Sequence, residues 1–326
     1  MKLLQRWFGQ PKAIRRWAFA SVIANVGIIV TGGAVRLTES GLGCPEWPKC
    51  TADSLTTTPE MGIYGVIEFG NRVLTFALVA VALGALLAAW LRIPRRTSLV
   101  RLAVLGMLYV PVQAIIGGIT VWTNLNPWVV GLHFLASIPL VALSVALYAR
   151  SGEPDGEVVE LVPRAVVLLG RGIVGVAFAV IVLGVVVTGS GPHAGDADTP
   201  RNGMDPALMS QLHADAVWLL LGLTVALIAA LHAVKAPLAA RRVAYALLAV
   251  ELSQGVIGYV QYYLDLPELL VGLHMLGAGV LWVAAVAVPF SLRRREPSVE
   301  AVPLHYEIHG EREGDVIVER EPEPAA

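Results

Sequence analysis

The sequence has few charges for its length. Only 15% of its 326 residues are Asp, Glu, Lys or Arg, whereas 56% are hydrophobic, and the mean hydropathy is +0.67. This composition excludes an ordinary soluble domain and indicates a membrane protein with several spans. The formal net charge of −1 argues against a nucleic-acid partner.

Cysteine is also scarce. The two present, Cys44 and Cys50, lie in one segment, GLGCPEWPKC. Their spacing matches neither a C-x-x-C redox motif nor a zinc pattern. In a loop outside the cytoplasm such a pair is most simply a disulfide. Two roles stay open for it: a staple of the loop, or a redox or cofactor-handling site.

Eight apolar runs are each long enough to cross ~30 Å of hydrocarbon. They lie at 17–35, 63–91, 102–120, 128–149, 165–188, 208–232, 243–263 and 268–291. Of the 24 Lys and Arg residues, 20 fall on one side of these runs, and only Arg36, Lys49 and Arg201 fall on the other. The positive-inside rule therefore predicts a multi-pass protein of the cell membrane with both termini cytoplasmic. We expect the first span to be retained, with no cleaved signal peptide.

The chain contains an internal repeat. QAIIGGITVWTNLNPWVVGLH (113–133) recurs as QGVIGYVQYYLDLPELLVGLH (254–274), and IIVTGG (28–33) resembles VVVTGS (185–190). Four spans per repeat is an even number, so both halves run the same way across the membrane, which disfavours an inverted-repeat transporter.

These features predict an all-α membrane fold of eight transmembrane helices, arranged as two parallel-repeat four-helix bundles. The N-terminal half covers residues 1–150 and carries the outer cysteine loop, 36–62. The C-terminal half covers 160–292. Residues 293–326 are charged and rich in Pro and Glu, so we expect a disordered cytoplasmic tail.

Histidines occupy matching places in the repeat. His133 and His274 are equivalent, and His213 lies equally early in the sixth span. The first-half position that matches His213 is Asn71, within EFGNR (68–72). Two histidines at one depth on different helices of a bundle are what axial ligation of a haem iron requires. The alternative is that they simply hydrogen-bond across helices.

An acid and a base also lie inside the second apolar run. Glu68 and Arg72 are four residues apart, so they share one helix face, and Asn71 is three residues from Glu68. One interpretation is an internal ion pair that neutralises both charges. The other is that both line a cavity, with Arg72 available to a propionate and Glu68 to chemistry at the ring edge. The two interpretations are compatible.

Three segments together resemble the heme A synthase family: TGGAVRLTESGLGCPEWPKC (31–50), EFGNR, and the two VGLH helices. The resemblance covers about residues 14–292. It implies an oxidoreductase that converts the C8 methyl of heme O, through an alcohol, to the formyl group of heme A for cytochrome c oxidase. It also implies that the N-terminal half holds the substrate and the C-terminal half a stable haem b.

The resemblance assigns roles to particular residues. It implies that His213 and His274 ligate the haem b iron and that His133 is one ligand of the substrate haem. Glu68 matches the catalytic glutamate, which would stabilise positive charge or place water as the methyl is oxidised. Cys44 and Cys50 match a cysteine pair found in part of the family.

Asn71 departs from the family pattern, E-F-x-H-R, which has histidine at this position. Three arrangements of the substrate haem stay open. Asn71 ligates weakly or holds a water, the iron is five-coordinate through His133 alone, or another side chain takes the site. We favour the second arrangement, because an open iron position suits the activation of oxygen or peroxide.

Other functions share some of these features. A non-catalytic two-haem membrane cytochrome of the b type would carry the same histidines, but it has no need for Glu68. A haem transporter or chaperone would bind haem without changing the porphyrin. A prenyl transferase is disfavoured, because the sequence has no paired Asp-rich sites for magnesium. As partners we expect heme O, the heme O synthase, an electron donor and membrane lipid, and we leave a homo-oligomer open.

Overall fold

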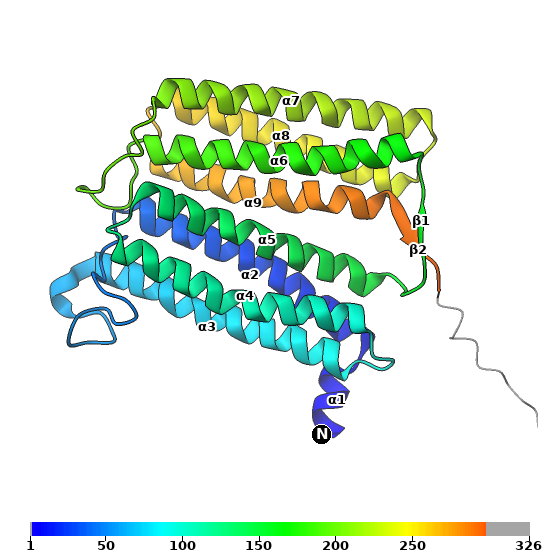
Figure 1. Ribbon diagram of the computed structural model, residues 1–326, viewed down its shortest axis with the longest axis horizontal. Coiled ribbons are helices and arrows are strands. Elements are labelled where there is room, and N and C mark those ends of the chain that lie inside the picture. Colours follow the sequence, from blue (N-terminus) through cyan, green and yellow to red (C-terminus); the bar gives the residue numbers. More distant parts are fainter. Residues whose placement is uncertain (1, 298–326) are drawn as a thin grey trace, which may run out of the picture.

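The computed structural model describes residues 2–297 and is built almost entirely of helices (Figure 1). The long helices are α2 (Pro11–Leu37), α3 (Gly62–Leu91), α4 (Thr97–Trp122), α5 (Pro127–Gly152), α6 (Arg164–Ser190), α7 (Pro206–Ala233), α8 (Leu238–Tyr263) and α9 (Glu268–Ser291). The short elements are α1 (Lys2–Phe8), η1 (Pro59–Met61), β1 (Val158–Glu160) and β2 (Arg293–Arg295). All eight long helices are long and apolar enough to cross a membrane. The predicted eight spans are therefore confirmed, and the chain is a multi-pass membrane protein.

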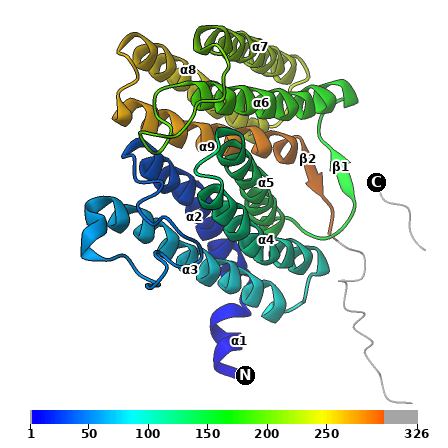
Figure 2. The ribbon, with the colours of Figure 1, turned by 60° about the vertical axis from the view of Figure 1, so that its left-hand side comes forward.

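The long helices form two groups of four, which lie side by side in Figures 1 and 2. In the first group α2 contacts α3, α3 contacts α4, α4 contacts α5, and α5 returns to α2. In the second group α6, α7, α8 and α9 contact one another in the same cyclic order. The groups meet through α2 and α5 on one side and α6 and α9 on the other. This contact order agrees with the sequence repeat.

Two tight turns also agree with the repeat. The turn between α4 and α5 places Asn124 and Leu125 at φ values of 48° and 56°, and the turn between α8 and α9 places Asp265 and Leu266 at 57° and 60°. Positive φ is uncommon for residues other than glycine. The two pairs are separated by the shift that relates the repeated VGLH segments, so each half turns back in the same way just before its VGLH histidine.

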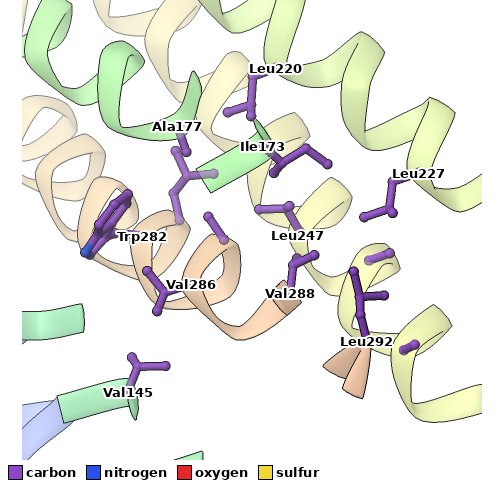
Figure 3. Close-up of a cluster of buried hydrophobic side chains, with 14 of the residues drawn as sticks. Val145, Ile173, Ala177, Leu220, Leu227, Leu247, Trp282, Val286, Val288 and Leu292 are labelled. Atoms are coloured by element: carbon purple, nitrogen blue, oxygen red, sulfur yellow. The ribbon is translucent and has the colours of Figure 1, made fainter. Parts of the chain in front are cut away.

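The largest buried cluster lies in the second group and extends across its border with the first (Figure 3). Ile173, Leu220 and Leu247 are almost fully buried and come from three different helices. Trp282 of α9 also belongs to it and donates a hydrogen bond from Nε1 to the backbone oxygen of Ile138 on α5, at 2.8 Å. An indole buried in a core needs such a partner, and this one joins the two groups.

The two ends of the helices differ. Segments 38–58 and 191–205 lie at one end, which we call the loop end, and β1 and β2 lie at the other, the strand end (Figure 1). At the strand end Arg96 donates to both carboxylate oxygens of Asp155, at 2.7 and 2.8 Å. This fork fixes the linker between α5 and α6, and it lowers the pKa of Asp155 below its usual value.

The sequence prediction placed the start of the disordered tail at residue 293, but the first residues of that segment are ordered. Strand β2, its first three residues, pairs antiparallel with β1, so that Val158 lies opposite Arg295 and Glu160 opposite Arg293. Backbone hydrogen bonds to the linker order these residues, although their charge favours disorder. Residues 298–326 of the predicted tail lie outside the described residues.

Candidate functional site

A cavity of about 1600 Å³ lies among the helices of both groups. A typical small-molecule site occupies about 300–1,000 Å³, so this cavity has room for more than one ligand of that size. Its lining is mainly apolar, and its polar residues include Glu68, Asn71, His133, His213 and His274. All five were singled out in the sequence, and the fold brings them to the same cavity.

His213 of α7 and His274 of α9 face one another in the second group. Their ring centres are 6.4 Å apart, and the ring planes are inclined at 76°. Metal–imidazole bonds are about 2.0 Å long, and an imidazole nitrogen lies about 1.1 Å from its ring centre, so two rings on opposite sides of one iron are about 6.2 Å apart. The observed separation therefore fits a single iron held between the two histidines.

The hydrogen bonds of the two histidines leave at least one ring nitrogen of each free to bind such an iron. Nδ1 of His213 lies 3.0 Å from the backbone oxygen of Val180 on α6. This contact orients the ring and leaves Nε2 free to ligate, as is usual for metal-binding histidines. Nδ1 atoms of His274 and His133 are buried and have no partner among the described residues. Among residues 2–297 no cluster of three or more His, Cys, Asp or Glu side chains is arranged to hold a bare metal ion.

Each histidine ring packs against a glycine of the preceding helix. A Cβ atom at Gly184 would lie 3.2 Å from Cε1 of His213, and the matching contacts of Gly117 with His133 and Gly258 with His274 are 3.2 and 3.3 Å. A larger side chain at these glycines would crowd the ring. The same helix-to-helix contact thus sets the position of all three histidines.

Asn71 occupies the fourth position of this pattern. GIIVTGG (27–33) aligns with GVVVTGS (184–190), so Gly27 corresponds to Gly184. No other side chain comes within 4 Å of a Cβ placed at Gly27. The space that His213 fills in the second group is therefore open in the first, and the buried Oδ1 of Asn71 has no partner among the described residues.

Glu68 is buried, with 6% of its surface exposed, and lies beside Asn71 on α3. Its Oε2 accepts a hydrogen bond from the backbone N–H of Cys44 at 2.5 Å. Its Oε1 accepts from Nε and Nη2 of Arg72, at 3.2 and 2.5 Å. The predicted ion pair is thus present, and both carboxylate oxygens have partners.

Arg72 has no guanidinium N–H group left to bind a propionate, as the contacts within the described residues show. Its Nη1 donates to the backbone oxygens of Glu46 and Lys49, and its Nη2 also donates to that of Cys44. Together with the bonds to Glu68, these contacts use the five N–H groups of a guanidinium. In this structure Arg72 anchors the cysteine loop to α3.

The predicted disulfide between Cys44 and Cys50 is confirmed. It closes the part of the loop that Arg72 holds, and both cysteines are fully buried. Trp47, between them, stacks edge-on against Trp122 of α4 and lines the cavity. The loop therefore covers the loop end of the first-group cavity.

The remaining histidines in the described range form hydrogen-bond contacts outside the cavity lining. His193 contacts the backbone oxygen of Leu266 through Nε2, at 2.8 Å, and His232 contacts the hydroxyl of Tyr245, at 3.0 Å. Neither side chain lines the cavity.

The sequence did not mark two further residues of the cavity, the half-buried Arg36 and the buried Glu251, as part of a site. Arg36 of α2 donates to the backbone oxygens of Thr188 and His193, at 2.8 and 2.5 Å, and so ties the first group to the loop of the second. Glu251 of α8 lies in the cavity wall with 4% of its surface exposed. A carboxyl inside the predicted span 243–263 was a signal for the second residue, because ionisable groups within a membrane are rare.

The comparison with known proteins points to one family. A family model described as COX15-CtaA, cytochrome oxidase assembly protein, matches residues 15–219, which include Glu68, Asn71, His133 and His213. Relatives called heme A synthase come from Listeria welshimeri (28% identity over 144 residues), Halalkalibacterium halodurans (26% over 148) and Exiguobacterium sibiricum (28% over 132). The matched segments cover 41%, 44% and 39% of this chain and 46%, 49% and 43% of the relatives. The chain thus spans about half the length of the curated relatives it matches.

The family match covers more than half of the chain and all of the first group of helices except residues 11–14 of α2. It also includes three of the four repeat-related positions, those of Asn71, His133 and His213. The chain belongs to the COX15-CtaA family of cytochrome oxidase assembly proteins.

Proposed function

We propose that this protein is a heme A synthase, an oxidoreductase that converts the C8 methyl of heme O to a formyl group. The family and the names of the relatives support the proposal. The observation that carries it is the pair formed by His213 and His274, whose ring separation of 6.4 Å fits one iron. The proposal places a stable haem b between these two residues.

The substrate, heme O, would bind in the first group of helices. His133 supplies the axial imidazole, held against Gly117 as His213 is held against Gly184. Asn71 faces the same cavity with an unpartnered Oδ1. A carboxamide is a much poorer iron ligand than an imidazole, so His133 would be the residue of this chain that holds the substrate iron.

Bound haem iron would supply the oxidising chemistry, and the residues of this chain would hold the ring and control charge. Glu68 is fixed by Cys44 and Arg72, so its carboxylate keeps one position at the wall of the cavity. A preorganised negative charge stabilises positive charge that develops on the substrate. Glu68 therefore acts on the methyl under oxidation, and Arg72 acts as a positioning residue for Glu68 and for the loop.

The two groups of helices would act as two units of a tandem repeat, residues 1–150 and 160–292. Basic residues concentrate at the strand end, which supports a plasma-membrane protein with that end and both termini in the cytoplasm. The disulfide loop would then lie outside, where a disulfide persists. Heme O would come from a heme O synthase, and a separate protein would act as the electron donor. The many apolar side chains exposed on the helices would face membrane lipid.

Conversion of heme O tests this proposal directly. Cells that make heme O but no heme A would express this chain or its Glu68→Gln variant, and the membrane haems would be separated by chromatography. We expect heme A with the native chain and, with the variant, unconverted heme O or its alcohol. A native chain that leaves heme O unchanged, although haem b is bound, would instead support a two-haem electron carrier.

A further inference from the structure

Glu251 is a buried carboxyl that the proposed reaction does not use. It lies in the middle of α8, and 4% of its surface is exposed. Oε1 accepts a hydrogen bond from Oγ1 of Thr224 on α7, at 2.7 Å. Oε2 is buried, and it has no hydrogen-bond partner in the part of the chain that the structure describes.

The position of Glu251 relates it to the histidine pair. It precedes Gly258, which touches the ring of His274, by seven residues, or about two helical turns. Residues with this spacing lie on one helix face. Likewise Thr224 follows His213 by eleven residues, about three turns of α7. Glu251 and Thr224 therefore lie on the helix faces that hold the histidines. They are nearer the strand end, Glu251 by about 10 Å and Thr224 by about 16 Å along their helices.

No cation within the described residues balances Glu251. The helices packed against α8 are α7 and α9. Their titratable residues are His213, Asp215, His232, Glu268 and His274. None of these forms a hydrogen bond or ion pair with Glu251, and its only polar contact among residues 2–297 is with Thr224. The first group has Val110 at the equivalent position of its repeat, so the carboxyl is a feature of the second group alone.

We propose that Glu251 is the proton-binding site that compensates charge changes in the haem b pocket. When one electron enters that pocket, a proton from solvent binds to Oε2, and an O–H bond forms while no bond within the protein breaks. When the electron leaves, the proton is released. The inference rests on the haem b site proposed above.

The expected size of this coupling follows from the distance. One unit of charge about 10 Å away, at an effective dielectric constant of about 20, changes the equilibrium constant for proton binding to a carboxyl by roughly 15-fold. By linkage the same factor applies to electron binding. At about 59 mV for each tenfold change, the midpoint potential should fall by about 70 mV as the pH rises through the range in which Glu251 titrates.

A spectroelectrochemical titration of the purified holoprotein tests the proposal, with electrons supplied by the electrode through mediator dyes. The midpoint potential of haem b would be measured at a series of pH values in the native protein and in Glu251→Gln. Glu268→Gln is the matched control, because it removes an exposed carboxyl from the helix that carries His274. We expect the fall of about 70 mV in the native protein and in the control, and its loss in Glu251→Gln.

An equal pH dependence in Glu251→Gln would overturn the inference, because the proton would then bind elsewhere. If that variant does not assemble with haem, labelling of the native holoprotein with dicyclohexylcarbodiimide, which reacts with protonated carboxyls in apolar surroundings, takes its place. We expect mass spectrometry to find more label on Glu251 in the reduced protein than in the oxidised one, and equal labelling would contradict the inference. A native protein without any haem b spectrum would reject the proposed function itself, which separates the two failures.

Discussion

Oε2 of Glu68 accepts a hydrogen bond from the backbone N–H of Cys44, so the buried acid of α3 is attached directly to a disulfide-bonded residue. Arg72 completes this connection, because it donates to Glu68 and to three backbone oxygens of the same loop. The proposed catalytic group and the cysteine loop therefore form one structural unit.

The first prediction concerns Arg72. In Arg72→Lys, an ammonium group has three donors in place of five and cannot form the same fork. Loss of two hydrogen bonds at about 1 kcal/mol each should increase loop opening about 30-fold. Tryptic cleavage after Lys49, an exposed residue between the cysteines, measures this opening. Arg201→Lys, in segment 191–205, is the control. An unchanged cleavage rate in Arg72→Lys would show that the hydrogen bonds of Arg72 do not hold the cysteine loop closed.

The second prediction concerns the disulfide. It joins residues six apart. Closing a loop of this length lowers the entropy of the unfolded segment and so stabilises the folded loop by about 2 kcal/mol. Reduction should therefore accelerate cleavage after Lys49 by about 30-fold. A variant with both Cys44 and Cys50 changed to Ser should be cleaved rapidly with or without reductant. If reduction leaves the native cleavage rate unchanged, other loop contacts are sufficient to hold the segment.

The third prediction concerns Asn71. Space remains beside Gly27, so an imidazole at position 71 should fit as His213 fits beside Gly184. Asn71→His should therefore convert the haem of the first group to a six-coordinate, low-spin form. Asn71→Gln keeps the amide and serves as the control. Absorption and electron paramagnetic resonance spectra report the spin state, and unchanged spectra in Asn71→His would reject the five-coordinate site.

The fourth prediction concerns the histidine pair. His213→Ala and His274→Ala each remove one of two axial nitrogens, so both should lower the haem b content and remove its low-spin signal. His232→Ala changes a residue of α7 that contacts Tyr245 and lies outside the cavity, so its haem b content should be normal. Retention of low-spin haem b after loss of His213 or His274 would exclude that residue as a ligand.

The fifth prediction concerns the linker at the strand end. Hydrogen bonds from Arg96 lower the pKa of Asp155 in the folded protein. The stability that this gives is therefore complete above the ordinary Asp pKa of about 3.9 and is lost as the pH falls through the lower, folded value. At neutral pH Asp155→Asn should unfold at a lower temperature than the native chain, and the two should converge in acid. The exposed Asp53→Asn is the control, and a difference that persists in acid would contradict the assignment.

Much of the fold could be predicted because its determinants are local in the sequence. A span needs about 20 apolar residues, and each helix shows this directly. The histidine positions were also predictable, because the repeat places His133 and His274 in register and points to Asn71 as the partner of His213. The disulfide followed from the presence of only two cysteines in one loop.

Other features depend on contacts between distant segments and left no comparable pattern. The pairing of β1 with β2 joins the linker to the end of α9 and so orders three arginines whose charge suggested disorder. Arg72 donates hydrogen bonds to backbone carbonyls of the cysteine loop. Every residue has a backbone carbonyl, so the sequence could not indicate which ones Arg72 binds. Glu251 was visible as a charge within a span, but its significance depends on Thr224 and on the face it shares with Gly258.

The most direct test of the central claim is the identity of the haems in the protein purified from membranes that contain heme O. Extracted haems would be separated by chromatography and identified by mass. We predict haem b together with heme O, its hydroxylated form or heme A. The first group of helices would hold the substrate or product, and the second group would hold haem b. Haem b alone, with no oxidised product when heme O is supplied, would contradict the account.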